Sequence, residues 1–124
     1  MSTIIAPVAA APKPKPAATL QQRLKAEQIR LAEATRLRGK CVRQNTEQWF
    51  PDNWRDADAE KACRGCWVQA ACFRLHVIDE ALIVANTGSS VSTAVRGVAG
   101  GLTPSKRRRY VKALADKLRA EASA

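Results

Sequence analysis

The chain has 124 residues, of which 46% are hydrophobic and only 5% aromatic, so it holds at most one small domain with a thin core. Its N-terminal segment lacks an early charge and carries four prolines within 16 residues, which does not fit a signal peptide. No uninterrupted apolar stretch is long enough to span a bilayer. These features argue against secreted and membrane proteins, and we expect a cytoplasmic protein without a membrane partner.

The first part of the chain predicts a leader followed by a helix. Residues 1–18 are rich in Ala, Pro and Lys without an apolar period, so we predict a disordered leader. Thr19 and Gln22 have the spacing of a capping box. Gly39 can end the helix near residue 38, although the pattern also allows it to continue through Cys41. The apolar stripe of this helix comprises Leu20, Leu24 and Leu31.

Two helices are predicted in the middle of the chain. After the turn-prone segment "NTEQWFPDNW", the acids from Asp56 to Glu60 favour the start of a short helix that would deliver Cys63 and Cys66. A second helix, about 67–84, would carry Cys72. Its packing candidates are Phe73, Val77 and Ile83. The segment "NTGSSVSTAVRG" reads as a loop.

The last predicted helix follows a capping signal, in which Thr103 precedes Pro104. Its apolar stripe comprises Tyr110, Val111, Leu114 and Leu118. No segment has the pattern of a strand bounded by turns. The fold class is therefore all-α, a small cluster of about four helices. We divide it into a leader (1–18), a cysteine domain (19–102) and a basic C-terminal helix (103–124).

Three of the four cysteines, Cys63, Cys66 and Cys72, fall within ten residues. Clustered thiols in a cytosolic protein more often bind metal or do redox work than form permanent disulfides. A zinc ribbon needs two C-x2-C knuckles and this chain has one, but a Cys3His zinc site that uses His76 without Cys41 stays open. Four thiolates are also the ligand set of a 4Fe-4S cluster, although the spacing matches neither ferredoxin pattern.

The order of these features resembles the WhiB-like proteins of actinobacteria and their phages. The resemblance rests on Cys41, "WFP", "CRGCWVQAAC" and "GVAGG" followed by a basic helix. It implies a 4Fe-4S cluster, sensitive to oxygen and nitric oxide, in a transcription regulator that contacts DNA and the C-terminal domain of the primary sigma factor. The cluster ligands implied by the resemblance are Cys41, Cys63, Cys66 and Cys72.

This chain departs from the family pattern at three places. Ala99 stands where the family's turn has Trp, Asn45 occupies a place where an acid is common, and the connection from Cys72 to Gly97 is longer than usual. The missing indole makes the sigma-factor contact less secure than the cluster, because a Trp in an interface commonly carries much of the binding energy.

Two further groups of residues have expected roles beside the thiols. Three aromatic residues are expected to shield the cluster or contact a partner: Trp49, Phe50 and Trp67. The Gly-rich stretch reads as a turn in which glycines supply positive φ before the last helix: Gly97, Val98, Gly100 and Gly101.

The net charge of +10 lies mainly at the two ends of the chain. Residues 41–102 carry six Lys/Arg against seven acids, whereas residues 103–124 carry seven Lys/Arg against two acids. Four consecutive cations wrap a helix, so several must project outward, and no acid is expected beside them. We predict phosphate contacts to DNA from Lys106, Arg107, Arg108, Arg109 and Lys112.

Two alternatives to a DNA-binding regulator remain. One is an interaction protein that titrates a sigma factor or another regulator without touching DNA. The other is a disulfide reductase, because C-x2-C is also a redox motif, but the strand–motif–helix context of thioredoxin is missing. The sequence has no paired carboxylates, catalytic triad or phosphate-binding loop, so neither an enzyme nor a small-molecule substrate is expected.

Overall fold

The computed structural model describes residues 17–36, 55–97 and 99–123, and these residues form helices and turns without a strand. The all-α prediction is confirmed. An isolated antiparallel bridge joins Ala99 and Leu102. The predicted leader lies outside the described residues up to position 16. The helices are α1 (Leu20–Thr35), α2 (Asp56–Cys63), α3 (Gln69–Thr87), α4 (Val91–Ala94) and α5 (Pro104–Ala122).

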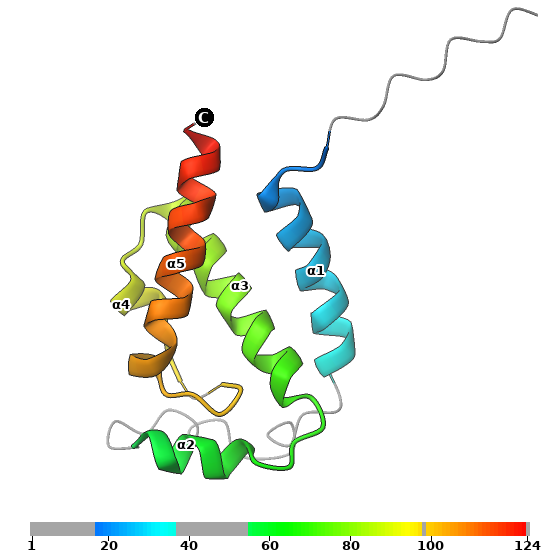
Figure 1. The fold of residues 1–124 in the computed structure, drawn as a ribbon, viewed down its shortest axis with the longest axis vertical. Coiled ribbons are helices and arrows are strands. Elements are labelled where there is room, and N and C mark those ends of the chain that lie inside the picture. The colour runs from blue at the N-terminus through cyan, green and yellow to red at the C-terminus, as the bar shows by residue number, and fades with distance from the viewer. Residues whose placement is uncertain (1–16, 37–54, 98, 124) are drawn as a thin grey trace, which may run out of the picture.

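Helix α3 is the centre of the molecule and packs against α1, α4 and α5 (Figure 1). Helix α5 runs parallel to α3, and α1 runs antiparallel to both. Helix α2 lies across the end of the bundle at which α3 and α5 begin (Figure 1). The cysteine segment and the first turns of the basic helix are therefore at the same end.

The predicted capping signals are confirmed. The amide of Gln22 donates to Thr19 Oγ1 at 3.1 Å, and the amide of Thr19 donates to Gln22 Oε1 at 2.9 Å, which completes the capping box of α1. At the start of α5, the amide of Lys106 donates to Thr103 Oγ1 at 3.4 Å, and Pro104 is the first helical residue. Local side-chain chemistry thus fixes where these two helices begin.

Several predicted boundaries differ from the structure, and helix α1 ends at Thr35 rather than near residue 38. Helix α2 ends at Cys63, so it delivers Cys63 but not Cys66. Helix α3 runs from Gln69 to Thr87, later than predicted at both ends, and stops at Gly88 with φ of 74°. The predicted loop contains the one-turn helix α4, because the hydroxyl of Ser90 accepts a hydrogen bond from the amide of Thr93.

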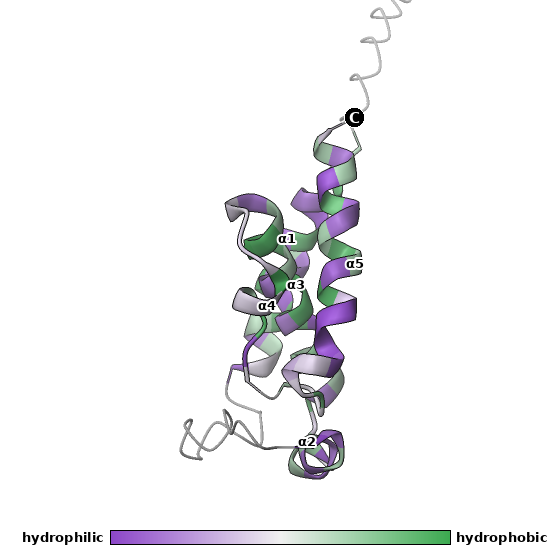
Figure 2. Ribbon diagram, turned by 90° about the vertical axis from the view of Figure 1, so that its left-hand side faces the viewer, coloured by the Kyte–Doolittle hydropathy of each residue, from purple (hydrophilic) through white to green (hydrophobic). Residues whose placement is uncertain are grey.

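The core lies between α3, α5 and α1, where the hydrophobic faces of the helices meet (Figure 2). Its fully enclosed side chains include Ile78 and Val84 of α3 and Val111 of α5. Leu24 is the contribution of α1 and is only 2% exposed. Val77 packs as predicted, whereas the prediction for Ile83 was wrong, because that side chain is 45% exposed on the outer face of α3.

Candidate functional site

Three cysteines lie along the corner between α2 and α3. Cys63 is the last residue of α2, Cys66 lies in the connection, and Cys72 is in the first turns of α3. The corner is closed by backbone hydrogen bonds, from Cys66 N to Cys63 O at 3.0 Å and from Cys72 N to Val68 O at 2.7 Å. Cys63 is buried and the other two are half-buried. Cys41 lies outside the described residues.

The described residues can be compared with what a zinc site formed without Cys41 would need. Within residues 17–36, 55–97 and 99–123, no three His, Cys, Asp or Glu side chains lie close enough together to hold one metal ion. The Cys3His alternative would require three thiols and His76 around a single ion. A 4Fe-4S cluster places a different requirement on the corner, because each iron takes one thiolate and the thiols need not converge on one point.

His76 is half-buried on α3, one turn after Cys72. Burial lowers the pKa of His76 below its ordinary value of 6.5, and the positive charge of Arg107 lowers it further. Glu80 and Asp79 act in the opposite direction with smaller effects. The imidazole is therefore neutral at neutral pH.

The Gly-rich turn sits directly on the start of α3. Gly100, with φ of 58°, lies so close to Phe73 that a Cβ added to it would collide with the backbone of α3. Beside it, the side-chain amide of Gln69 donates to the carbonyl of Gly100 at 3.4 Å. Gly97 and Gly101 also have positive φ, which confirms the predicted role of these glycines. Val98 lies outside the described residues.

Ala99 is an interior residue of this turn. It is 2% exposed, and its amide and carbonyl both bond to Leu102, at 3.2 and 3.0 Å. An indole at this position could not be accommodated without moving the turn. Ala99→Trp is therefore unsuitable as a probe of the sigma-factor contact that the family resemblance implies.

Arg107 is completely buried, so the prediction that it contacts DNA was wrong. Its Nε donates to Glu80 Oε1 at 2.7 Å and its Nη2 donates to Glu80 Oε2 at 3.1 Å, which makes a two-pronged ion pair between α5 and α3. The remaining guanidinium hydrogens reach three backbone carbonyls around the turn. These are Arg96 at 2.6 Å, Gly97 at 2.9 Å and Leu102 at 3.2 Å.

Glu80 is the structural residue that sequence reasoning missed. Its side chain is nearly buried within the most apolar part of α3, and it also accepts a hydrogen bond from the amide of Arg96 at 3.1 Å. An acid at helical spacing from Val77 and Val84 was the available signal, because a buried carboxylate requires a charged or hydrogen-bonding partner.

The other predicted cations remain on the surface. Lys106, Arg108 and Arg109 are exposed on the first turns of α5. Arg109 places its guanidinium 5.0 Å from the ring centre of Tyr110. Lys112 pairs with Asp116 one turn later at 2.9 Å, with both side chains more than half exposed. The expectation that no acid would lie beside the four consecutive cations was therefore wrong for Arg107.

A comparison with known families decides where this arrangement belongs. The family described as transcription factor WhiB matches residues 36–110, which is more than half of the chain. The chain belongs to the WhiB family of transcription factors. The matched range includes all four cysteines, the Gly-rich turn and the start of α5. No curated protein and no solved structure matched the chain.

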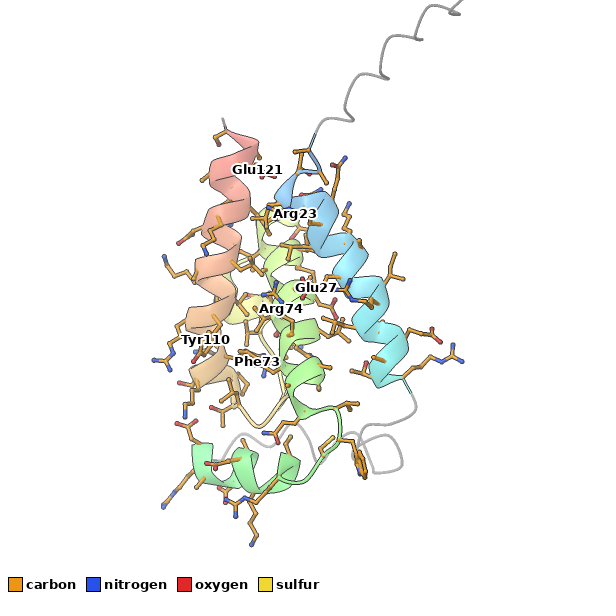
Figure 3. The ribbon with its side chains drawn as sticks, turned by 45° about the vertical axis from the view of Figure 1, so that its right-hand side comes forward. Arg23, Glu27, Phe73, Arg74, Tyr110 and Glu121 are labelled. Atoms are coloured by element: carbon orange, nitrogen blue, oxygen red, sulfur yellow. The ribbon has the colours of Figure 1, made fainter. Side chains whose placement is uncertain are left out.

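The helix α1 of this WhiB-family chain lies before the matched range, and the last three turns of α5 lie after it. These two flanking parts are joined to the matched region and to each other. Arg74 of α3 forms a two-pronged pair with Glu27 of α1 at 2.8 and 3.0 Å (Figure 3). The carboxylate of Glu121 in α5 accepts from the amide of Leu20 at the start of α1, at 2.7 and 2.9 Å.

Among the aromatic residues predicted beside the thiols, only Trp67 is described. Its side chain is 95% exposed and lies next to Cys66. Both residues line an open cavity of about 530 Å³, which is also lined by Phe73, Gly100 and Tyr110. Trp49 and Phe50 lie outside the described residues of the WhiB-family chain.

None of the described helices is both long enough and apolar enough to pass through a membrane.

Proposed function

We propose that this WhiB-family chain is a cytoplasmic DNA-binding transcription regulator that carries a 4Fe-4S cluster on Cys41, Cys63, Cys66 and Cys72. The proposal rests on the contacts of the Gly-rich turn, which touches the cysteine corner on one side and the basic helix α5 on the other. On one side, Gly100 rests against the backbone of Phe73, close to the cysteine corner. On the other, Arg107 of the basic helix holds the carbonyls of Gly97 and Leu102.

The cysteine corner supports the cofactor through its donor set. Soft thiolate ligands favour iron–sulfur clusters over the hard, oxygen-preferring cations. When bound, the cluster supplies a redox-sensitive centre that oxygen or nitric oxide can alter. Any change in the backbone of the corner would be transmitted to the turn, because Gly100 has no space between itself and α3.

The exposed cations support the DNA contact. Lys106, Arg108 and Arg109 oppose the dipole of their own helix at its N-terminus, so they cost folding stability and are better explained by an anionic partner. We expect phosphate contacts rather than base reading, with Lys112 added when its weak surface pair to Asp116 opens.

Anaerobic purification with iron and acid-labile sulfide analysis tests the cofactor. We expect four iron and four sulfide per chain, the content of the proposed cluster. Replacing any of the four cysteines with Ser should remove the visible absorption band. Zinc without sulfide would contradict the proposal, and so would a Cys41→Ser protein that keeps its cluster.

The salt dependence of DNA binding tests the basic helix. Replacing Lys106, Arg108 and Arg109 together with Ala should flatten the slope of log affinity against log salt by about two to three units, since each phosphate contact contributes about 0.9. A matched control removes three exposed cations of α1: Arg23, Lys25 and Arg30. Equal slopes for the two triple variants would show that α5 does not contact DNA.

The second candidate is an interaction protein that binds the primary sigma factor or another regulator without DNA. The exposed indole of Trp67 favours it, because a projecting aromatic side chain is a common anchor in interfaces. A pull-down with the C-terminal domain of the primary sigma factor tests this candidate. Loss of capture in Trp67→Ala, in a chain that fails to shift DNA, would place this function first.

A further inference from the structure

A second hollow lies between α3 and α5, on the side of these helices where Arg74 reaches Glu27 of α1 (Figure 3). It has a volume of about 390 Å³. Its apolar lining comes from Phe73 and Val77 of α3 and from Ala113 and Leu114 of α5. We call it the α3–α5 groove.

An aromatic pair lines the α3–α5 groove. The rings of Phe73 and Tyr110 meet edge to face, with centres 5.2 Å apart and an interplanar angle of 87°. This pair also separates the groove from the cavity beside Cys66, because both hollows are lined by the same two rings. Tyr110 remains 41% exposed, so its ring is available to a partner.

Among the described residues that line the α3–α5 groove, three are charged and all three are positive: Arg74, Arg109 and Lys117. Glu27 of α1 is paired with Arg74 at the edge of the groove. The hydrogen bonds from Arg74 lower the pKa of Glu27 and keep its carboxylate ionised. Arg109 and Lys117 are thus exposed cations beside an apolar floor.

We propose that the α3–α5 groove binds an acidic amphipathic helix of a protein partner. Its apolar side chains would enter between Val77 and Leu114, and its carboxylates would pair with Arg109 and Lys117. A nucleic acid backbone complements the cations but has no apolar side chain to fill the floor. Residues 1–18 of this chain carry Lys without any acid, so their charge does not complement the rim. The inference goes beyond the proposed DNA and cluster functions and does not depend on them.

Peptide display against the intact purified chain tests this proposal. A library of random 16-residue peptides is selected on the immobilised protein, and the recovered peptides are labelled and measured by fluorescence anisotropy. We expect net acidic peptides with apolar residues three or four positions apart. Recovery of no peptide above background, or of peptides without net negative charge, would overturn the proposal.

Substitutions in the groove locate the binding site. Ala113 is exposed and lines the groove, so Ala113→Glu introduces a carboxylate there without disturbing the core, and it also engages Lys117 one turn later. We expect it to weaken peptide binding at least about tenfold. Lys117→Glu should act in the same direction.

The matched control is Ala32→Glu, which makes the same change in net charge at an exposed site of α1. It should bind the peptides as the wild type does, and circular dichroism should show the same helix content in all variants. Equal affinity of Ala113→Glu and wild type would overturn the proposal. Because Arg109 serves both proposals, displacement of the peptides by duplex DNA would reassign the groove to nucleic acid only if it persists in Arg109→Ala. A self-association that Ala113→Glu abolishes would reassign the groove to a second copy of the chain.

Discussion

Arg107 and the three exposed cations around it have the same chemistry in the sequence and opposite roles in the structure. Arg107 compensates the buried charge of Glu80 and satisfies three carbonyls, so its removal leaves a carboxylate in the core without a countercharge. Arg107→Ala should therefore lower the free energy of unfolding by about 3–5 kcal/mol. Arg108→Ala, at an exposed site, should change it by less than about 0.5 kcal/mol.

Urea denaturation of both variants measures this difference. Replacing the pair by apolar residues, with Glu80→Leu and Arg107→Met together, should cost less than Arg107→Ala alone because no isolated charge remains. Equal stability of Arg107→Ala and Arg108→Ala would refute the structural role of the buried guanidinium.

Gly100 and Gly88 require glycine for different reasons. Both have positive φ, but a Cβ at Gly88 meets nothing within 4 Å, whereas a Cβ at Gly100 meets the backbone of α3. Gly88→Ala should lower the free energy of unfolding by about 1–2 kcal/mol, the conformational cost alone. Gly100→Ala should cost at least about 1 kcal/mol more, because α3 must move. Thermal unfolding of the two variants provides the comparison, and equal costs would contradict the close approach.

His76 makes the stability of the fold depend on pH. Its folded-state pKa is lowered, so the unfolded chain takes up a proton at His76 before the native chain does as pH falls. The stabilising contribution is complete above the unfolded value of 6.5 and is lost as pH falls below it towards the folded value. The chain has no second histidine.

The urea midpoint should therefore decrease as the pH is lowered from about 7.5 to about 5.5, a range that lies above the one in which carboxylates titrate. His76→Gln should show a smaller fall over the same range, because it removes the titrating group. An unchanged pH dependence in this variant would assign the effect to another group.

At the scale of elements, the helix starts could be predicted because their signals are local. Thr19 with Gln22, and Thr103 with Pro104, satisfy amides that lie only three residues away. The sequence of four adjacent cations does not tell which of them is buried, because the orientation of the Arg107 side chain depends on its contacts with α3 and the Gly-rich turn. The spacing of Arg107 from Val111 pointed to the buried face, but the charge of the side chain argued against it.

The candidate site was predictable in its composition and less so in its geometry. The cysteine spacing predicted three thiols in one short segment, but it did not specify that α2 ends at Cys63, where Gly65 with positive φ begins the turn towards α3. The groove beside Tyr110 could not be predicted, because it requires knowing how α5 packs on α3. Ala113 and Phe73 line it together but lie 40 positions apart in the chain.

Helix α1 lies outside the matched family region, and its attachment can be tested at two side chains. Leu24 is 2% exposed within the core, whereas Ile29 on the same helix is 73% exposed. Leu24→Ala should lower the free energy of unfolding by about 2–4 kcal/mol through lost burial and the cavity left behind. Ile29→Ala should change it by less than about 0.5 kcal/mol. Guanidinium denaturation distinguishes this outcome from a loosely attached α1, for which both variants would resemble the wild type.

At the scale of the whole molecule, the start of α1 and the end of α5 meet through Glu121. A carboxylate at the C-terminus of its own helix is unfavourable, but here it lies at the positive end of α1 and accepts from Leu20 N. Glu121→Gln should weaken this contact by about 0.3–1 kcal/mol. Amide hydrogen exchange at Leu20 should become faster, whereas Glu33→Gln at an exposed site of α1 should leave it unchanged. Equal exchange rates in the two variants would show that the contact does not hold α1.

The buried pair of Glu80 and Arg107 also has an evolutionary consequence. Loss of either charge alone leaves the other stranded in the core, whereas loss of both together leaves an interior that apolar residues can fill. In descendants of this chain, the two positions should therefore change in concert, while Arg108 and Arg109 drift independently of them. Of the four adjacent basic residues, Arg107 would therefore covary with Glu80, 27 positions upstream, rather than with its sequence neighbours.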